Sequence, residues 1–492
     1  MPISKSQYLK GLQCHKALWL LKNKPELKSK VTEATQAIFE QGTEVGKLAQ
    51  KLFPSGIEIE FNPKNFAGMI AQTKEILDTN SAITIYEATF DYNGCFAMLD
   101  ILVKTTEGLE IYEVKSSTGA KDVYLEDLSF QVYILQSLGY KVTKASLINI
   151  NNEYIYNGLE LNLKELFKIE NFTHQLFTRA KHVPNLVTKM QSALAGNEPD
   201  IEIGSHCDKP YECDFKGYCW SHIPEVSVFS LSNARGKDWD LYNQGYIKLE
   251  DIPLTKSVLS QISNKHIQQI ESYVQNKTHI NQEAIAKELA KLKFPIAFLD
   301  FETYQDAIPQ HAGTRPFEQI PFQYSLHILE TPESELGHKE FLADPNQDPR
   351  KDFITTLLSD LPATGSIVVY NRSFEAGVLE KLAGYFPELE PSIKDVLERF
   401  FDLMLFFQRR DYYHPDMHGS YSIKKVLPAL IPELRHSDLA ISDGGSASRA
   451  FVNLRNLKDP NEIKRVRDNL LAYCKLDTLA MVEIWRVLQG LD

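Results

Sequence analysis

Two short motifs in the C-terminal part of the chain place side chains where they can hold metal ions. Asp300 and Glu302 lie in a short apolar run, and residues two apart on a strand point to the same side. Tyr473 and Asp477 lie in a helix-like stretch, Val466–Leu488, where residues four apart share a face. Carboxylates arranged in this way can hold divalent metal ions for in-line attack on a phosphate. The spacing therefore predicts a metal site that acts on phosphodiesters.

The order of these motifs resembles the proofreading-type 3′-to-5′ exonucleases of the DEDD superfamily, in the branch with tyrosine in its third motif. That family has Asp-x-Glu on the first strand of an RNase H-like sheet, an acid in an Asn-x-x-Phe-Asp segment, and Tyr-x-x-x-Asp on a helix. Residues 371–375 read Asn-Arg-Ser-Phe-Glu, so a glutamate stands where the family usually has aspartate. An isolated Asp-x-Glu is more often a solvated strand end, but three motifs in this order favour a nuclease site. The resemblance implies that Tyr473 orients the attacking water and that two Mg²⁺ or Mn²⁺ ions are bound by Asp300, Glu302, Glu375 and Asp477.

Four of the six cysteines are distributed in a way that suits metal binding. Cys207, Cys213 and Cys219 are evenly spaced in a short segment rich in turn formers and aromatics, and Cys14 lies alone near the start. Three local thiols are one short of a tetrahedral thiolate site, which a distant fourth would complete. Such a site would tie the first helix to the end of the same domain. Spacing alone leaves zinc, an iron–sulfur cluster and buried free thiols open.

A second acidic motif lies between these cysteines. Asp100 belongs to one strand-like run, and after a turn at residues 107–108 a second run contains Glu113 and Lys115. On adjacent strands Asp100 and Glu113 can chelate a hard cation through oxygen. Lys115 shares the face of Glu113 and can position or polarise the attacking water. Alone, Glu-x-Lys is usually a salt-bridged strand edge.

The combination of this motif with bracketing cysteines resembles the PD-(D/E)XK nuclease core. More narrowly, it is similar to the RecB-type branch that includes the CRISPR-associated adaptation nuclease and carries a four-iron cluster between one early and three late cysteines. The resemblance covers roughly residues 1–222. It implies a second nuclease centre, formed by Asp100, Glu113 and Lys115, and a 4Fe-4S cluster held by Cys14, Cys207, Cys213 and Cys219.

Two features depart from the RecB-type pattern. These enzymes commonly take a metal-binding histidine from an early helix, but residues 39–49 contain none, so Glu87 or Glu44 is the expected substitute ligand. In the same stretch Gly42, Gly46 and Ala49 share a helical face, which predicts close backbone packing. The later Gln-x-x-x-Tyr motif is present only in part, because residue 131 is glutamine but residue 135 is leucine.

These motifs predict an α/β multidomain fold for the 492-residue chain. Residues 1–222 form the RecB-like PD-(D/E)XK, restriction-endonuclease-like domain, with a mostly helical section at 161–194. Residues 294–492 form the RNase H-like DEDD exonuclease domain. A helical section, residues 223–293, joins them and includes helices expected at 256–274 and 282–291. Within it, residues 241–249 fit the turn of a phosphate-binding helix-hairpin-helix element, and a plain helical connector fits at least equally well.

Composition limits the partners and the compartment. The formal net charge of −12 argues against broad electrostatic coating of DNA or RNA, although local basic patches remain compatible with a nuclease. No apolar run approaches membrane-spanning length, no basic–apolar leader opens the chain, and six cysteines do not make a disulfide scaffold. We therefore expect a cytoplasmic protein with no membrane partner.

A loop at residues 412–422 carries aromatic, histidine and hydroxyl side chains and is followed by Lys424 and Lys425. It suits base stacking and phosphate contact, whereas the alternative is that its tyrosines cap the sheet. The domain order also resembles an uncharacterised bacterial family that joins an exonuclease-like domain to a RecB-like nuclease.

The prediction is a bacterial-type, two-headed, metal-dependent nuclease, a 3′-5′ exonuclease favouring single-stranded DNA, with RNA also open. The alternative is a nucleic-acid-binding or scaffold protein whose nuclease folds have decayed. Glu375 and the missing histidine favour that alternative. The sequence does not identify the biological pathway or any protein partner.

Overall fold

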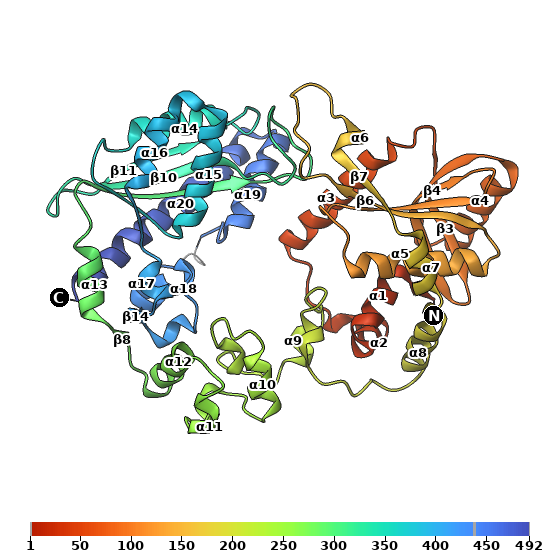
Figure 1. Cartoon of the computed structure of the whole chain (residues 1–492), viewed down its shortest axis with the longest axis horizontal. Coiled ribbons are helices and arrows are strands. Elements are labelled where there is room, and N and C mark those ends of the chain that lie inside the picture. Colours follow the sequence, from red (N-terminus) through yellow and green to blue (C-terminus); the bar gives the residue numbers. More distant parts are fainter. Residues whose placement is uncertain (1, 436–438, 492) are drawn as a thin grey trace. The chain divides into compact units, whose positions relative to one another are not determined.

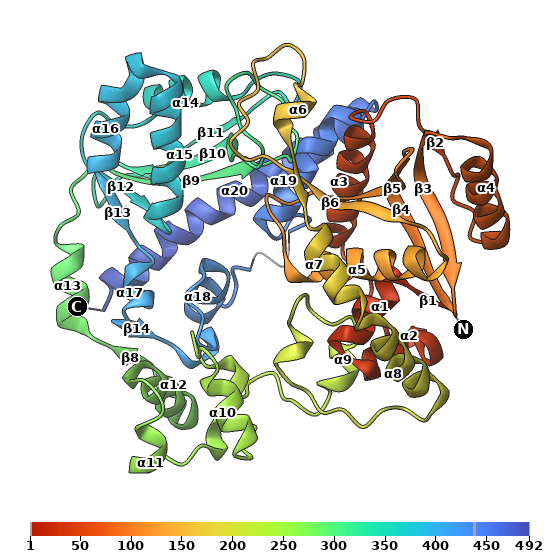
Figure 2. The same ribbon diagram turned by 45° about the vertical axis from the view of Figure 1, so that its right-hand side comes forward.

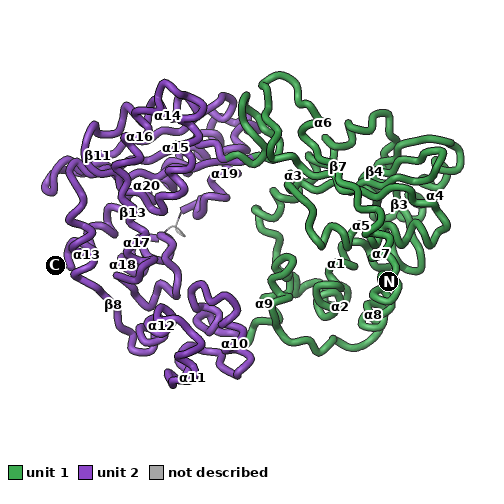
Figure 3. Tube along the Cα trace, in the orientation of Figure 1, with its two compact units in different colours: residues 1–222, 306–318 green, residues 223–305, 319–492 purple. Residues whose placement is uncertain are grey.

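The computed structural model describes residues 2–435 and 439–491 and divides into two compact units (Figure 3). Unit 1 comprises Met1–His222 and Asp306–Glu318, and unit 2 comprises Ile223–Gln305 and Gln319–Asp492. Each unit is built on a sheet with helices packed against it, so the predicted α/β multidomain class is confirmed. Within the described residues, no helix is long and apolar enough to cross a membrane.

Unit 1 contains a seven-stranded sheet with the order β2-β3-β4-β5-β6-β7, and the short β1 pairs with β4. Strands β3, β4 and β5 run antiparallel through hairpins, and β6 is parallel to β5 because the helix α5 (Asp122–Ser137) crosses between them. The strands are β1 (Ile3–Ser4), β2 (Ile57–Glu58), β3 (Ile83–Tyr92), β4 (Cys95–Lys104), β5 (Leu109–Lys115), β6 (Val142–Ile150) and β7 (Phe167–Asn171).

Helices cover both faces of this sheet. Figure 2 shows α5 and α7 (Thr173–Ala180) on one side, where they share a core with α1 (Lys5–Gln13) and α8 (Val183–Ala195). The other core contains Val45 and Ala49 of α3 (Glu33–Gln50). The expectation of close packing at Gly42 and Gly46 is wrong, because a Cβ atom at either position would meet nothing within 4 Å.

Strands β3 and β4 exchange faces halfway along their length. Ile85 and Ala88 in β3 belong to the same core, and so do Leu99 and Leu102 in β4, although the members of each pair are three positions apart. A regular strand returns to the same face every second residue, so each strand contains one extra residue here. These extra positions are Glu87, with a backbone φ of +56°, and Asp100. Because of this irregularity, the side chains of Glu87 and Asp100 lie in the same part of unit 1.

Unit 2 contains a five-stranded sheet with the order β11-β10-β9-β12-β13. The strand β10 is antiparallel to both neighbours, whereas β12 is parallel to β9 and β13. The strands are β9 (Ile296–Tyr304), β10 (Ile320–Leu329), β11 (Gly337–Leu342), β12 (Ser366–Val369) and β13 (Phe400–Asp402). The first strand along the chain is thus central, with a strand on each side.

The side chains of β9 alternate between the two faces of the sheet, and this alternation determines which face Asp300 and Glu302 share. Ala297, Leu299 and Phe301 pack with the helices α14 (Arg350–Asp360), α15 (Arg372–Tyr385) and α16 (Glu390–Glu398). Ile296 and Phe298 pack with α20 (Pro460–Gln489) on the opposite face, which also carries α17 (Leu405–Gln408) and α18 (Ile423–Leu430) (Figure 1). Because side chains alternate, the next two residues of the second series, Asp300 and Glu302, lie on the α20 face.

Several predicted segments differ from the structure. The section at 161–194 contains the strand β7 between its helices, because that segment pairs with the edge of β6. The helix expected at 256–274 is two helices, α11 (Lys256–Leu259) and α12 (Asn264–Gln275), because Ser263 caps the second through the amide of His266. At residues 241–249, which fit the turn of a helix-hairpin-helix element, the turn after α10 (Lys237–Asn243) leads into a single 3-10 turn, Leu249–Asp251.

Candidate metal centres

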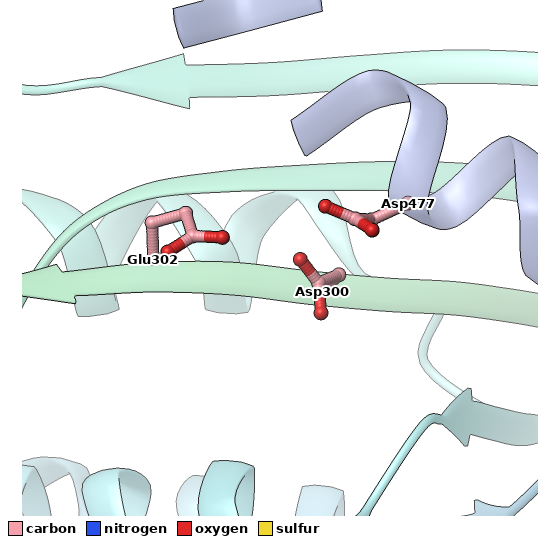
Figure 4. Close-up of side chains that lie close together, drawn as sticks. All are labelled: Asp300, Glu302 and Asp477. Atoms are coloured by element: carbon pink, nitrogen blue, oxygen red, sulfur yellow. The ribbon is translucent and has the colours of Figure 1, made fainter. Parts of the chain in front are cut away.

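Three carboxylates meet between β9 and α20. Asp300 and Glu302 project from the strand towards Asp477 on the helix (Figure 4). One oxygen from each side chain can be chosen so that all three lie within 4.8 Å of one another. Within the described residues this is the one group of acids, histidines or cysteines that meets this spacing. The two sequence motifs therefore form one site, with the donor oxygens that Mg²⁺ and Mn²⁺ prefer.

Tyr473 lies one helical turn before Asp477, and its side chain is 3% exposed. The tyrosine side chain lies close enough to Glu302 to favour ionisation of its carboxylate. The Nζ atom of Lys424 lies 5.4 Å from the centroid of the Tyr473 ring, and its charge also favours ionisation of Glu302. The helix α19 (Gly444–Asn453) also lies close to Glu302, since a Cβ atom on Gly444 would lie 3.1 Å from Oε2 of Glu302.

The three acids repel one another in a site where Asp300 and Glu302 are half-buried and Asp477 is buried. Burial and the nearby charge of Asp477 raise the pKa of Glu302 to about 8. Burial, Asp477 and Glu302 together hold the pKa of Asp300 well above its usual range. Such shifts arise where carboxylates share a site without enough positive charge. A divalent cation supplies that charge, so the donor set fits a metal ion.

We expect a pH dependence of stability from these shifts. The folded protein in EDTA retains protons that the unfolded chain releases above about pH 4, so the free energy of unfolding falls as the pH rises towards 8. Bound Mn²⁺ favours the ionised carboxylates and should remove much of this loss. Urea unfolding at pH 5 and pH 8, with Mn²⁺ or EDTA, measures the effect. Glu302→Gln in EDTA should lose part of the pH dependence, and an unchanged dependence would contradict the assignment.

Glu375 lies outside the group of three. It is on the first turn of α15 and is 1% exposed, and its Oε2 atom has no hydrogen-bond partner among the described residues. Burial, with the charges of Asp402 and Glu302, raises its pKa to about 8. Asp402 fixes the start of this helix, because its carboxylate accepts hydrogen bonds from the amides of Asn371 and Arg372, both at 3.2 Å. Glu375 thus lies near Asp300, Glu302 and Asp477 but is not part of that group.

In unit 1 the hairpin of β4 and β5 brings Asp100 beside Glu113, as the sequence predicts. The amide of Val114 donates a hydrogen bond to Oδ2 of Asp100 at 2.7 Å. The Nζ atom of Lys115 lies 2.7 Å from Oε1 of Glu113 and 2.9 Å from Oδ2 of Asp127. All three residues of the predicted PD-(D/E)XK-like motif therefore lie together.

Lys5 and Gln131 complete this cluster. Gln131 is the glutamine of the partial Gln-x-x-x-Tyr motif, whereas Lys5 was not predicted. The Nζ atom of Lys5 lies 2.8 Å and 3.0 Å from the two carboxylate oxygens of Glu113 and 3.6 Å from Oδ1 of Asp100. The Nε2 atom of Gln131 donates hydrogen bonds to Glu113 at 2.7 Å and to Asp127 at 3.2 Å. We call Lys5, Asp100, Glu113, Lys115, Asp127 and Gln131 the acid–lysine centre.

The electrostatics of the acid–lysine centre differ from those of unit 2. Although burial alone would raise the pKa of Glu113, Lys115 and Lys5 hold it well below its usual range. Burial and Glu113 raise the pKa of Asp100 to about 6, and burial and Asp100 raise that of Glu87 to about 7. Two ammonium groups thus lie among the carboxylates, and no three acids here meet the 4.8 Å spacing of the unit 2 group.

The four predicted cysteines line one cavity in unit 1. They surround it together with Phe215 and Ala17, which belong to the same small apolar core. Burial raises the pKa of Cys219 to about 11 and also raises that of Cys14 and of Cys213. Thiols in such a place stay protonated at neutral pH unless a bound metal ion displaces the proton.

The sulfur spacing bears on which metal fits. A single zinc ion with Zn–S bonds of about 2.3 Å brings its sulfurs about 3.8 Å apart. No three of the sulfurs of Cys14, Cys207, Cys213 and Cys219, all of them described, lie within 4.8 Å of one another. As placed, the sulfurs are thus not drawn together around one zinc ion, and the same thiols suit either zinc or an iron–sulfur cluster.

One signal in the sequence points to Asp127, which was missed, through its spacing from Gln131. Asp127 and Gln131 are polar residues four apart on α5, in a run that is otherwise largely buried and apolar, and they are 2% and 1% exposed. Buried polar side chains of this kind are held by partners. No comparable signal marks Lys5, because its stretch contains many lysines and its partners are distant in sequence.

Comparison with known proteins gives similarities but no activity. Residues 297–422 match a family described as a domain of unknown function, DUF2779. An uncharacterized protein of Ureaplasma parvum serovar 3 is 27% identical over 423 residues, which is 78% of this chain and 59% of that protein. An uncharacterized protein of Mycoplasma genitalium is 29% identical over 220 residues, or 41% of this chain and 33% of that protein. The chain thus spans from about a third to about three fifths of these relatives' lengths.

Proposed function

We propose that the chain is a metal-dependent nuclease whose principal centre, in unit 2, trims single-stranded DNA from its 3′ end. The observation that carries this proposal is the convergence of Asp300, Glu302 and Asp477 on one point, with Tyr473 one turn away. The mixed sheet with β9 at its centre supports an RNase H-like fold of the DEDD type. RNA is the alternative substrate, since nothing in the acidic group distinguishes the two sugars.

Each residue of the unit 2 centre has a separate task in this reaction. Asp300, Glu302 and Asp477 would hold Mg²⁺ or Mn²⁺, which activates water and neutralises charge on the phosphate. Tyr473, whose hydroxyl favours ionisation of Glu302, orients the attacking water. Lys424, whose Nζ atom lies 5.4 Å from the centroid of the tyrosine ring, supplies positive charge beside the phosphate.

A basic cavity adjoins this centre and supports a nucleic-acid substrate. It has a volume of about 540 Å³, and Lys424, Lys425, Arg435 and Ser442 line it together with a single acid, Asp416. Lys424 belongs both to this cavity and to the surroundings of Tyr473. Lysines and arginines next to a metal site can neutralise the phosphates of a bound strand.

The cavity gives a prediction for binding. Lys425→Ala should weaken binding of a single-stranded oligonucleotide and lower the slope of log affinity against log salt by about one, because one phosphate contact is lost. Fluorescence anisotropy at several salt concentrations, in Ca²⁺ or EDTA, measures this. The matched control is Lys394→Ala on α16, which covers the other face of the sheet and pairs with Glu390. Equal effects of both substitutions would argue against the cavity.

We further propose that unit 1 has a RecB-like PD-(D/E)XK fold with a second nuclease centre, and that Cys14, Cys207, Cys213 and Cys219 hold a 4Fe-4S cluster. Asp100 and Glu113, helped by Glu87, would hold the metal ion, and Lys115 would position water. The second candidate for unit 1 is nucleic-acid binding without cleavage. It is favoured by Lys5 and Lys115, which already neutralise Glu113.

Separate substitutions test the two centres. Asp300→Asn should abolish end-dependent trimming and leave any internal cutting, whereas Lys115→Ala should do the converse, because sites that share no residues normally act independently. A circular single strand reports internal cutting alone, and a linear one reports both reactions. If Asp300→Asn removed all activity from a folded protein, unit 1 would bind without cutting. If it removed none, the principal proposal would be wrong.

A further inference from the structure

The helix α1 joins the acid–lysine centre to the cysteines of unit 1. Its first residue is Lys5, whose Nζ atom contacts both carboxylate oxygens of Glu113. Its C-cap is Cys14, whose amide donates to the carbonyl of Lys10 at 2.9 Å. A helix of nine residues is about 13 Å long, so one rigid element separates the two groups.

The far end of α1 is fastened to the cysteine segment by side chains. The Nε2 atom of Gln13 donates hydrogen bonds to the carbonyls of His206 at 2.8 Å and Tyr211 at 2.7 Å. The Nζ atom of Lys10 forms a salt bridge with Asp214 at 2.8 Å. The helix is therefore held by the segment that carries Cys207, Cys213 and Cys219. In addition, the fourth cysteine, Cys14, lies at the C-terminal end of the helix itself.

A second route leads from the cysteine segment to Lys115. Tyr211 lies between Cys207 and Cys213 in the chain, and its phenol group lies close enough to that of Tyr124 for the two to interact electrostatically. The ring of Tyr124 lies beside Lys115, whose Nζ atom is 5.4 Å from the ring centroid. The cysteine segment thus reaches both lysines of the acid–lysine centre, one through α1 and the other through a pair of tyrosines.

We propose that the cysteine centre positions both lysines, so that the metal held by the cysteines controls the geometry of the acid–lysine centre. Lys5 and Lys115 are positioning residues in this scheme. A lysine side chain has four rotatable bonds, and it stays on its partners only where its backbone is fixed. Without the cysteine-bound metal, α1 and the loop around Tyr211 lose their anchor and Lys5 leaves Glu113. The proposal rests on the metal centre at the cysteines but does not require unit 1 to cleave anything.

Lysine acetylation followed by mass spectrometry tests this coupling without measuring activity. In anaerobically purified wild-type protein, Lys5 should react at least about tenfold more slowly than Lys74, an exposed lysine on α4 (Phe66–Thr79), because its ammonium group is held by two carboxylates. In Cys14→Ser, Lys5 should react as fast as Lys74. In Cys95→Ser, which changes a buried thiol of β4 outside the cysteine centre, Lys5 should remain slow.

Two further measurements keep the test decisive. Circular dichroism of Cys14→Ser checks that the sheet persists. If the sheet is lost, the variant Gln13→Ala is used in place of Cys14→Ser, because it removes two α1 contacts and retains all thiols. Gln13→Ala should raise the reactivity of Lys5 several-fold. Slow Lys5 acetylation in a folded variant that has lost its metal would overturn the proposal.

Metal analysis separates this proposal from the proposed nuclease function. Wild-type protein with neither iron nor zinc at the cysteines would overturn the coupling. An inactive wild-type protein that contains metal and shows the expected Lys5 pattern would contradict only the nuclease activity of unit 1.

Discussion

Replacing Asp477 with asparagine should reduce 3′-end trimming by about 10³-fold or more. The side chain keeps its size but loses the charge that, with Asp300 and Glu302, would hold the metal ion. Removal of a buried like charge also relieves repulsion, so the protein should fold at least as well as the wild type. A labelled oligonucleotide in Mn²⁺ reports the rate. Asp352→Asn, an exposed acid on α14, is the control and should leave the rate unchanged.

Tyr473→Phe separates positioning from metal binding in the same assay. The ring remains to pack between α20 and its neighbours, and only the hydroxyl, which favours ionisation of Glu302, is lost. We expect a rate lower by about 10²-fold with nearly unchanged substrate binding, since one positioning or proton-transfer contact is removed. Full activity in Tyr473→Phe would show that the tyrosine is a packing residue only.

The second large effect concerns the cysteines. Wild-type protein purified without oxygen should be brown and contain iron and sulfide, and Cys207→Ser should contain almost none. Structural metal sites contribute apparent binding free energies on the order of 10 kcal/mol, so unit 1 should also unfold at a much lower temperature in this variant. Iron and sulfide analysis, with calorimetry, measures both effects.

Cys474→Ser gives the matched control for the cluster. This thiol lies beside Asp300, with its Sγ atom 3.6 Å from the Asp300 carbonyl, and belongs to unit 2. The substitution should leave the iron content unchanged. Stoichiometric zinc without iron in the wild-type protein would contradict the cluster.

The acidic group of unit 2 could be predicted from the sequence because each half of it depends on a local period. Asp300 and Glu302 continue the alternation of an apolar strand, and Tyr473 and Asp477 are one turn apart on a long helix. The hairpin that brings Asp100 to Glu113 was also predictable, since the turn between the strands is short. In both cases the spacing in the chain determines which side chains face the same way.

The remaining features depend on packing between distant segments. Lys5 reaches Glu113 across 108 positions, and no local pattern marks that contact. The face exchange at Glu87 and Asp100 adds one residue to each strand at the same level, so the pairing register is unbroken and the pattern looks regular. Residues 306–318 lie within the region assigned to the exonuclease domain but pack in unit 1, where the amide of Tyr156 donates to the carbonyl of Thr314. Periodicity carries no information on such contacts.

Product analysis of a single-stranded oligonucleotide labelled at its 5′ end tests the central claim most directly. With Mn²⁺, the wild-type protein should give a ladder that shortens one nucleotide at a time from the 3′ end, and EDTA or Asp300→Asn should abolish it. A 3′-blocked oligonucleotide should resist this trimming. A blocked strand degraded as fast as a free one, or a ladder that persists in Asp300→Asn, would contradict a metal-dependent 3′-to-5′ exonuclease centre at Asp300, Glu302 and Asp477.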